Sequence, residues 1–228
     1  MSMEKKLKKR GIMMLAAFFV VLGVIFMPIF NGVNGLDFMD NLYNSISKQS
    51  AYFIPAVTEK AKQHNGTAVD LELLMKDEQQ AQQSAKLLEK GGATVVVTGS
   101  TMKVTGDLGA ILQNALADSD LMYANDGTKI VEKYGYNERQ VLYNWYNILK
   151  LTQKNLNKQK NFVEADIVSR VVKRAVQVSY NYYTIEPQSI MDALLLVSFS
   201  LVFYVFYTLW YGYGIMYLFE GLGLKIGH

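Results

Sequence analysis

The chain has 228 residues, of which 50% are hydrophobic and 19% are charged, and its formal net charge is +3. The absence of cysteine excludes disulfides, thiol nucleophiles, iron–sulfur clusters and cysteine-ligated zinc. The small positive charge comes mainly from the N-terminus, and no basic stretch is interleaved with aromatic residues, so we expect no nucleic-acid partner.

Two long apolar runs lie near the ends of the sequence. The first, residues 12–30, is about 19 residues long and follows the basic cluster 5–10. It exceeds the apolar part of a signal peptide and no small-residue cleavage site follows it, so we expect an uncleaved membrane anchor rather than a signal peptide. The second run, Ala193–Phe219, is about 27 residues long, which is more than a bilayer core requires.

The charges that flank these runs predict the topology. Basic residues precede the first run, and Lys225 and His228 follow the second. Basic flanks stay on the cytoplasmic side, so we expect a two-pass protein of the inner or plasma membrane with both termini cytoplasmic. The predicted segments are a cytoplasmic N-terminus 1–11, transmembrane helices 12–31 and 189–219, an extracytoplasmic (periplasmic) domain 32–188, and a cytoplasmic tail 220–228. An external domain of this size without disulfides fits a bacterial or archaeal cell envelope better than a eukaryotic secreted protein.

Helical periodicity dominates the external segment. Apolar residues recur on one helical face from Asn137 to Lys158 and again from Phe162 to Tyr183, which predicts a helical hairpin joined by a short polar link. A third amphipathic helix is predicted over Thr67–Lys90, with its glutamine-rich middle solvated, and a fourth from Leu36 to a break before Pro55. Four such helices with short connections predict an antiparallel bundle.

A segment rich in β-branched residues separates the third predicted helix from the helical hairpin. The β-branched runs Ala93–Thr98 and Thr101–Thr105 predict a small β-hairpin, at about 93–105. It should pack on the helices; the alternative is that it pairs with the edge of another chain. Asp107 should then cap a short helix, Leu108–Ala117, followed by a loop or helical turn over 118–127. The predicted fold is therefore mainly α: two transmembrane helices flanking an extracytoplasmic antiparallel helical bundle with a small β-hairpin insertion.

Neither a metal site nor a catalytic site emerges from the sequence. Several oxygen-bearing side chains lie close together in the predicted loop: Asp118, Asp120, Asn125 and Asp126. Their spacing does not match a calcium-binding loop, so we interpret them as a solvated, helix-capping loop. With only His64 and His228 in the chain, a histidine metal site is excluded, and a serine–histidine–aspartate site would depend on His64 in a polar helix end. We expect no catalytic, cofactor-binding or metal-binding residues and no enzymatic activity.

Two sets of residues are predicted to bind partners. Buried phenol and indole groups need hydrogen-bond partners, so the aromatic residues of the second apolar run should face protein rather than lipid. The helical hairpin carries an excess of basic residues, which is either a solvated face or a docking surface for an acidic partner or anionic lipid heads. The first set is Tyr204, Tyr207, Trp210, Tyr211 and Tyr213, and the second is Lys150, Lys154, Arg170, Lys173 and Arg174.

These patterns favour a non-catalytic, membrane-anchored accessory or scaffold subunit of an envelope membrane protein complex. The lipid bilayer would be one partner of the chain. Its external domain and its tyrosine-rich span would bind other membrane protein subunits or another copy of the chain. The first alternative is an extracytoplasmic ligand-binding or sensor protein that signals to a separate partner, because the layout is similar to the sensing half of bacterial transmembrane receptors. Aromatic clusters at 143–146 and 180–183, interpreted as bundle core, would then wall an apolar pocket. The second alternative is a self-assembling envelope protein.

Overall fold

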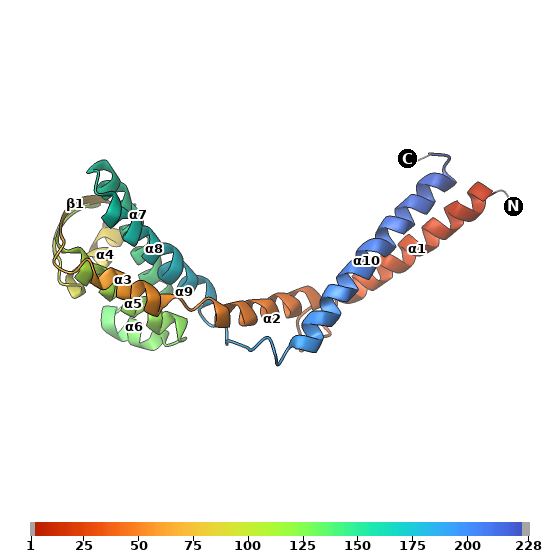
Figure 1. Ribbon diagram of the computed structural model, residues 1–228, viewed down its shortest axis with the longest axis horizontal. Helices are drawn as coiled ribbons and strands as arrows, with labels where there is room; N and C mark the ends of the chain where they lie inside the picture. The colour runs from red at the N-terminus through yellow and green to blue at the C-terminus, as the bar shows by residue number, and fades with distance from the viewer. Residues whose placement is uncertain (1–2, 225–228) are drawn as a thin grey trace. The chain divides into compact units, whose positions relative to one another are not determined.

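The computed structural model describes residues 3–224, which form two compact units (Figure 1). The terminal unit combines the two ends of the chain, Met1–Ser47 and Pro187–His228, and the central unit is Lys48–Glu186. Lys225 and His228, which contributed to the topology prediction, lie outside the described residues.

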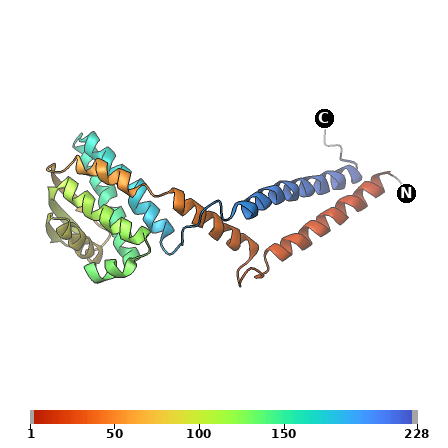
Figure 2. The same cartoon turned by 60° about the horizontal axis from the view of Figure 1, so that its bottom comes forward.

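The terminal unit is built on two antiparallel helices, α1 (Met3–Ile25) and α10 (Leu194–Gly221), which lie side by side (Figures 1 and 2). Within residues 3–224, α10 alone is long and apolar enough to cross a membrane. The second predicted span therefore agrees with the structure in length and apolarity. The chain is mainly helical as predicted, but a two-span topology stays a prediction.

The first predicted span differs from the helix that forms. α1 includes the basic cluster in its first turns and ends at Ile25, so its uncharged part has only about 15 residues, or about 22 Å of rise. Pro28 disfavours helical backbone at Met27, and Asn31 and Gly32 both have positive φ, at 51° and 84°. The residues after Ile25 therefore form a turn, and the chain re-enters a helix at α2 (Gly35–Ser50).

The central unit contains a three-stranded antiparallel sheet in the order β1-β3-β2. The predicted β-hairpin is confirmed as β2 (Thr94–Thr98) and β3 (Thr101–Asp107), joined at Gly99, whose φ of 58° favours glycine. The hairpin packs on the helices, as expected, through contacts of both strands with α4 (Glu78–Lys90). Asp107 caps the next helix by accepting a hydrogen bond from the Gly109 backbone, also as expected.

The third strand, β1 (Ala68–Leu74), corrects the helix predicted over Thr67–Lys90. Val69, Leu71 and Leu73 are buried while the residues between them are exposed, which is the two-residue period of a half-buried strand. Leu74, which the predicted helix over Thr67–Lys90 places on its apolar face, is instead 65% exposed. The helix starts only at Glu78, where the Asp77 carboxylate accepts a hydrogen bond from the Gln80 backbone.

Helices cover one face of this sheet, so the central unit is a layered α/β structure rather than a pure bundle (Figures 1 and 2). The predicted helical hairpin is confirmed as α7 (Glu138–Lys158) followed by α8 (Phe162–Val171), a π-helical turn (Val172–Val176) and α9 (Gln177–Tyr182). The break before Pro55 is also confirmed, because Pro55 stands in the first turn of α3 (Ile54–Lys62). The remaining helices are α5 (Leu108–Tyr123) and α6 (Gly127–Tyr134).

α5 is longer than predicted and places part of the expected loop inside the core. The predicted helix ended at Ala117, but helical structure continues to Tyr123. Asp118, Ser119 and Met122 therefore lie on the buried face of α5. One aromatic of the predicted core, Trp145, is fully buried, whereas Tyr143 and Tyr180 are exposed.

Candidate functional site

Part of the predicted aromatic surface of α10 is occupied by α1 of the same chain. The Tyr207 hydroxyl donates to the Phe18 carbonyl at 3.2 Å, and Trp210 Nε1 donates to the Met14 carbonyl at 3.1 Å. The Phe18 ring stacks on Tyr207 with ring centroids 4.2 Å apart and also contacts Tyr211, at 5.0 Å. Tyr207 and Trp210 thus find the partners that their polar groups require within the chain itself.

The other aromatic residues of this set point outward. Tyr204 is 66% exposed, Tyr213 is 50% exposed and Tyr211 is 41% exposed. In the described part of the chain, the hydroxyls of these three residues make no hydrogen bond. Tyr204, Tyr211 and Tyr213 are therefore the members of the set that remain open to another molecule.

Glycines set the distance between α1 and α10. A Cβ atom on Gly11 would overlap the backbone of Leu218 and Gly214, and one on Gly221 would overlap the backbone of Lys8. Gly23 and Gly212, on the same two helices, face open space instead. Small residues at the crossing let the two backbones approach closely, as they do at helix contacts in membranes.

An apolar groove of about 620 Å³ opens where α1, α2 and α10 meet in the terminal unit. Its walls include Leu22, Phe38, Phe199 and Tyr204. At its rim the hydroxyls of Tyr43 and Ser200 are 2.6 Å apart and hydrogen-bonded. This volume lies within the usual range of ligand pockets, and a lining of this kind suits an apolar group such as a lipid acyl chain.

The predicted basic residues do not gather at one place. Lys150 and Lys154 line a shallow depression on the exposed face of α7, together with Lys158. The other three lie on α8 and the π-helical turn, and two of them have partners in the chain. Arg170 forms an ion pair with Asp166 at 2.6 Å, and the Arg174 guanidinium lies over the Phe53 ring at 5.0 Å, whereas Lys173 is exposed.

The central unit contains a buried polar cluster that the sequence did not indicate. Asp118 is 0% exposed and accepts hydrogen bonds from Trp145 Nε1 at 2.7 Å, the Tyr134 hydroxyl at 2.5 Å and Lys133 Nζ at 2.6 Å. The interpretation of Asp118 as part of a solvated loop was therefore wrong, because the extension of α5 turns this carboxylate inward. These three donors, one of which is the partly exposed Lys133 ammonium, satisfy the buried carboxylate.

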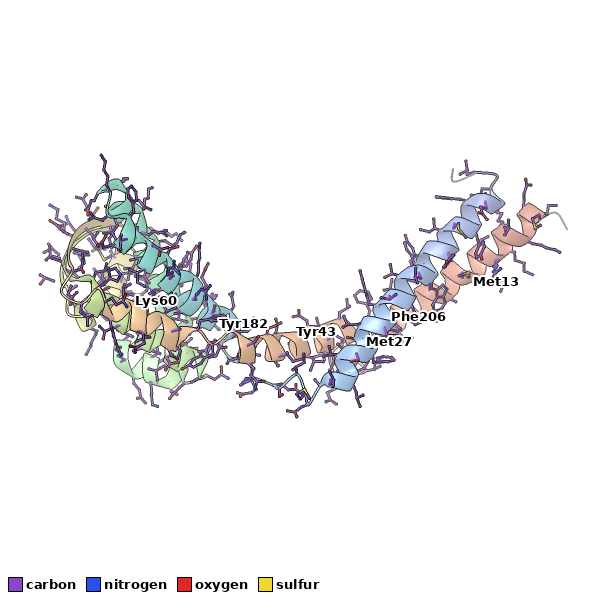
Figure 3. The ribbon with its side chains drawn as sticks, in the orientation of Figure 1. Met13, Met27, Tyr43, Lys60, Tyr182 and Phe206 are labelled. Atoms are coloured by element: carbon purple, nitrogen blue, oxygen red, sulfur yellow. The ribbon has the colours of Figure 1, made fainter. Side chains whose placement is uncertain are left out.

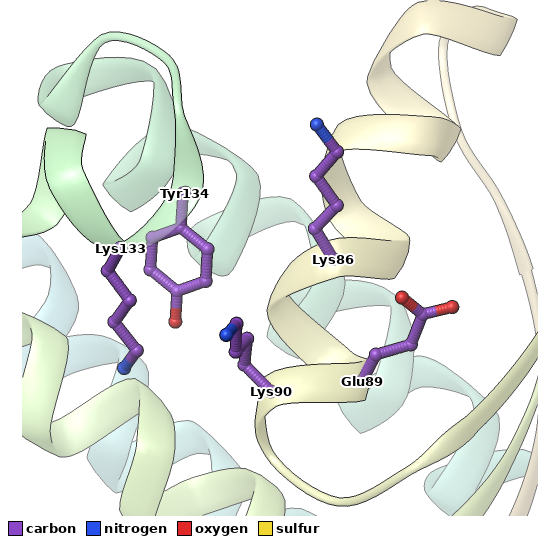
Figure 4. A pocket seen from close by; sticks show the side chains of 5 residues that line it. All are labelled: Lys86, Glu89, Lys90, Lys133 and Tyr134. Atoms are coloured by element: carbon purple, nitrogen blue, oxygen red, sulfur yellow. The ribbon is translucent and has the colours of Figure 1, made fainter.

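A small cavity of about 300 Å³ lies beside this cluster, between α4 and α6 (Figure 4). Lys133 and Tyr134 form one wall, and Lys86, Glu89 and Lys90 form the other. Burial and the neighbouring Asp118 carboxylate raise the pKa of Tyr134, so its phenol stays protonated. Lys133 is already bound to Asp118 and Asn114, so its ammonium is not free to act as a base in the cavity.

A second polar cluster joins the two ends of the central unit. The Lys48 ammonium is 1% exposed and donates to the carbonyls of Tyr182, at 3.1 Å, and Ile185, at 2.6 Å, as well as to the Asn125 side chain. Asn125, whose φ is 61°, in turn donates to Ile185 and to the Glu186 carboxylate. Burial lowers the pKa of Lys48, against the opposing effect of Glu186.

The remaining residues of the candidate calcium loop also have partners. Asp120 accepts a hydrogen bond from the Tyr52 hydroxyl at 2.7 Å, which raises the pKa of Tyr52 to about 12. Asp126 pairs with Lys129 at 2.5 Å, which lowers the pKa of the Asp126 carboxyl. Across residues 3–224, no three acidic or histidine side chains lie close enough to hold a metal ion.

Comparison of the chain with protein families, with curated proteins and with solved structures gave no match. The functional argument therefore starts from the geometry of the two units alone.

Proposed function

We propose that this chain is a non-catalytic accessory or scaffold subunit, anchored in a bacterial inner membrane by its terminal unit. The observation that carries this proposal is the outward surface of the α1–α10 hairpin. Large apolar side chains point away from the pair: Leu195 is 88% exposed, and Phe206 and Met13, labelled in Figure 3, are 68% and 60% exposed. A surface of this kind is unfavourable in water and favours insertion into lipid or burial against other apolar helices.

In the proposed topology both helices of the hairpin enter the bilayer and both termini stay cytoplasmic. The uncharged part of α1 is shorter than a bilayer core of about 30 Å, so α1 inserts as a partner of α10 rather than alone. The basic residues at the start of α1 stay at the head groups, where long basic side chains keep their charge in water. The central unit is then extracytoplasmic.

Partner binding is assigned to the surfaces that the chain leaves open. The hydroxyls of Tyr204, Tyr211 and Tyr213 need acceptors, which a polar group on a neighbouring transmembrane helix supplies. Lys150 and Lys154 on α7 form the second surface, which favours an acidic partner, and Lys173 is a separate exposed basic residue on the π-helical turn. Tyr207, Trp210, Arg170 and Arg174 act within the chain.

Mild-detergent purification of the tagged full chain tests this proposal. We expect the wild-type chain to copurify with unrelated membrane subunits in fixed stoichiometry. Tyr204→Ala combined with Tyr213→Ala should remove those subunits, while Phe206→Leu, on the exposed apolar surface, should retain them. A wild-type chain that purifies without other subunits in several detergents would contradict the proposal.

The topology has its own test because the chain contains no cysteine. A single cysteine at Gln79, an exposed position in the central unit, should react with a membrane-impermeant maleimide in intact spheroplasts. A cysteine at Ser2 should react only after lysis. The opposite labelling pattern would overturn the proposed orientation.

A further inference from the structure

The two edges of the sheet in the central unit differ. The outer edge of β1 is covered by α7: Asn155 Nδ2 donates to the Glu72 carbonyl and Gln159 Nε2 donates to the Asp70 carbonyl, both at 3.0 Å. These amides occupy the backbone acceptors that another strand would need. The edge formed by β1 is therefore closed to strand addition.

The register of the sheet defines which groups of β2 point outward. Because the carbonyls of Asp70 and Glu72 face α7, their partners in β3, Thr105 and Lys103, must direct their backbone groups toward β2. These two residues are opposite Thr94 and Val96 in β2. Val95 and Val97 alternate with Thr94 and Val96 along β2, so the N–H and C=O groups of Val95 and Val97 point away from the sheet. Within residues 3–224 these outward groups make no hydrogen bond.

β2 also lacks the devices that usually protect an edge strand. Its sequence, Thr94–Thr98, contains no charged residue and no proline, and its pairing with β3 is continuous without a bulge. Val96 is 59% exposed on the solvent face of the sheet. On the opposite face Val95 and Val97 pack against the core but stay partly exposed. An uncharged edge with open backbone groups on a folded unit is a surface for strand pairing.

The strand is its own complement. Thr-Val-Val-Val-Thr reads the same in both directions, so two copies can pair antiparallel about a two-fold axis through Val96. The outward N–H and C=O groups of Val95 then form hydrogen bonds with those of Val97 in the second copy, and Val97 does the same with Val95 of that copy. Val96 lies opposite Val96 in a non-hydrogen-bonded pair, where side chains are closest. Thr94 lies opposite Thr98.

We infer that β2 is the interface of a homodimer, in which the two sheets join into one continuous six-stranded sheet. The occupant of this edge is a second copy of the chain because its sequence symmetry matches the alternation of its open backbone groups. Pairing would satisfy the outward groups of Val95 and Val97 and cover apolar surface on both faces of the strand.

Disulfide trapping in the full chain tests this interface, since the chain has no cysteine of its own. The Cα atoms of a non-hydrogen-bonded antiparallel pair are about 4.5 Å apart, which is within the range of a disulfide. Val96→Cys in detergent with a mild oxidant should therefore give a cross-linked dimer. The control is Leu74→Cys, which is equally exposed on the same face but lies in the covered edge strand, and it should stay monomeric on a non-reducing gel.

Light scattering after size-exclusion chromatography gives an independent measurement. Val96→Lys places two ammonium groups opposite each other at the two-fold axis. Their repulsion should raise the dissociation constant of the dimer at least tenfold and shift the chain to monomer. Leu74→Lys adds the same charge and should leave the dimer intact. A monomeric wild-type chain, a dimer unaffected by Val96→Lys, or equal cross-linking of the two cysteine variants would overturn the inference.

Discussion

The terminal and central units place their large side chains in opposite ways. In the central unit Trp145, Leu112 and Met122 are fully buried, and most charged residues face outward. In the terminal unit the crossing of α1 and α10 is made by glycines and Phe18, while leucines and phenylalanines point outward. The central unit has the pattern of a domain that folds in water, whereas the terminal unit has the pattern of helices that need an apolar surrounding.

The two tryptophans of the chain show the same contrast. Trp145 donates its indole proton to a buried carboxylate, Asp118, inside a core of a water-soluble type. Trp210 donates to a backbone carbonyl of α1, in a unit whose described residues contain little other hydrogen bonding between the two helices. Since each unit has one tryptophan, Trp210→Phe leaves a probe of the central unit and Trp145→Phe leaves a probe of the terminal unit.

The largest effect is expected for Asp118→Leu. Removing this carboxylate leaves the Trp145 indole and the Tyr134 hydroxyl without their acceptor and Lys133 without its counter-ion. The free energy of unfolding of the central unit should fall by about 3–5 kcal/mol. Urea unfolding followed by Trp145 fluorescence in the Trp210→Phe background measures it.

The matched control is Asp166→Asn, which breaks an ion pair with Arg170 whose two side chains are well exposed. Solvent screens this pair, so the change should stay below about 1 kcal/mol. Equal effects of the two substitutions would mean that the buried cluster does not distinguish the core of the central unit from its surface.

A smaller effect is expected for Gly11→Leu in the terminal unit. The new side chain would overlap the backbone of α10, so α1 must move away, at a cost of about 2–3 kcal/mol. Trp210 then loses its hydrogen bond to Met14, which should change its emission in the Trp145→Phe background. Gly23→Leu makes the same change where no atom is near, and its emission should match that of the parent. We expect no change in the central unit with either variant.

The smallest effect is a pH dependence of the central unit. Burial raises the pKa of Tyr136 to about 12, whereas an unfolded tyrosine ionises near pH 10. Between these values the folded state binds more protons than the unfolded state. The stabilisation is therefore complete below pH 10 and is lost as the pH rises through 12, by about 1–2 kcal/mol.

Chemical unfolding at pH 9 and pH 11.5 measures this loss, and Tyr136→Phe should reduce it. Tyr180→Phe, which removes an exposed phenol, controls for the substitution itself. An unchanged pH dependence in Tyr136→Phe would remove Tyr136 as its source.

Long periodic elements were predictable from the sequence because their pattern repeats over many residues. The helical hairpin of α7 and α8 repeats its apolar face over several turns, so only a helix satisfies it. β1 was missed because its seven residues precede a genuine helix and because Leu71 and Leu74 fit a helical spacing as well. The two-residue alternation of a short strand therefore competes with the 3.6-residue period of the helix that follows it, and the predicted helix extended into the strand.

The polar clusters could not be predicted because their partners are distant in sequence. Asp118 meets Lys133, Tyr134 and Trp145, which lie 15 to 27 residues away and on two other helices. Lys48 meets Ile185 across 137 residues. No local pattern marks such pairs. Asparagine tolerates a positive φ better than most residues, but the sequence alone does not show that Asn125 adopts one.

The hydrogen bond between Lys48 and the Ile185 carbonyl has a consequence for modularity. It brings the first and last segments of the central unit within a single side chain of each other. A domain whose ends meet can be excised and replaced by a few flexible residues, or transplanted into a surface loop of a different host, without stretching either chain.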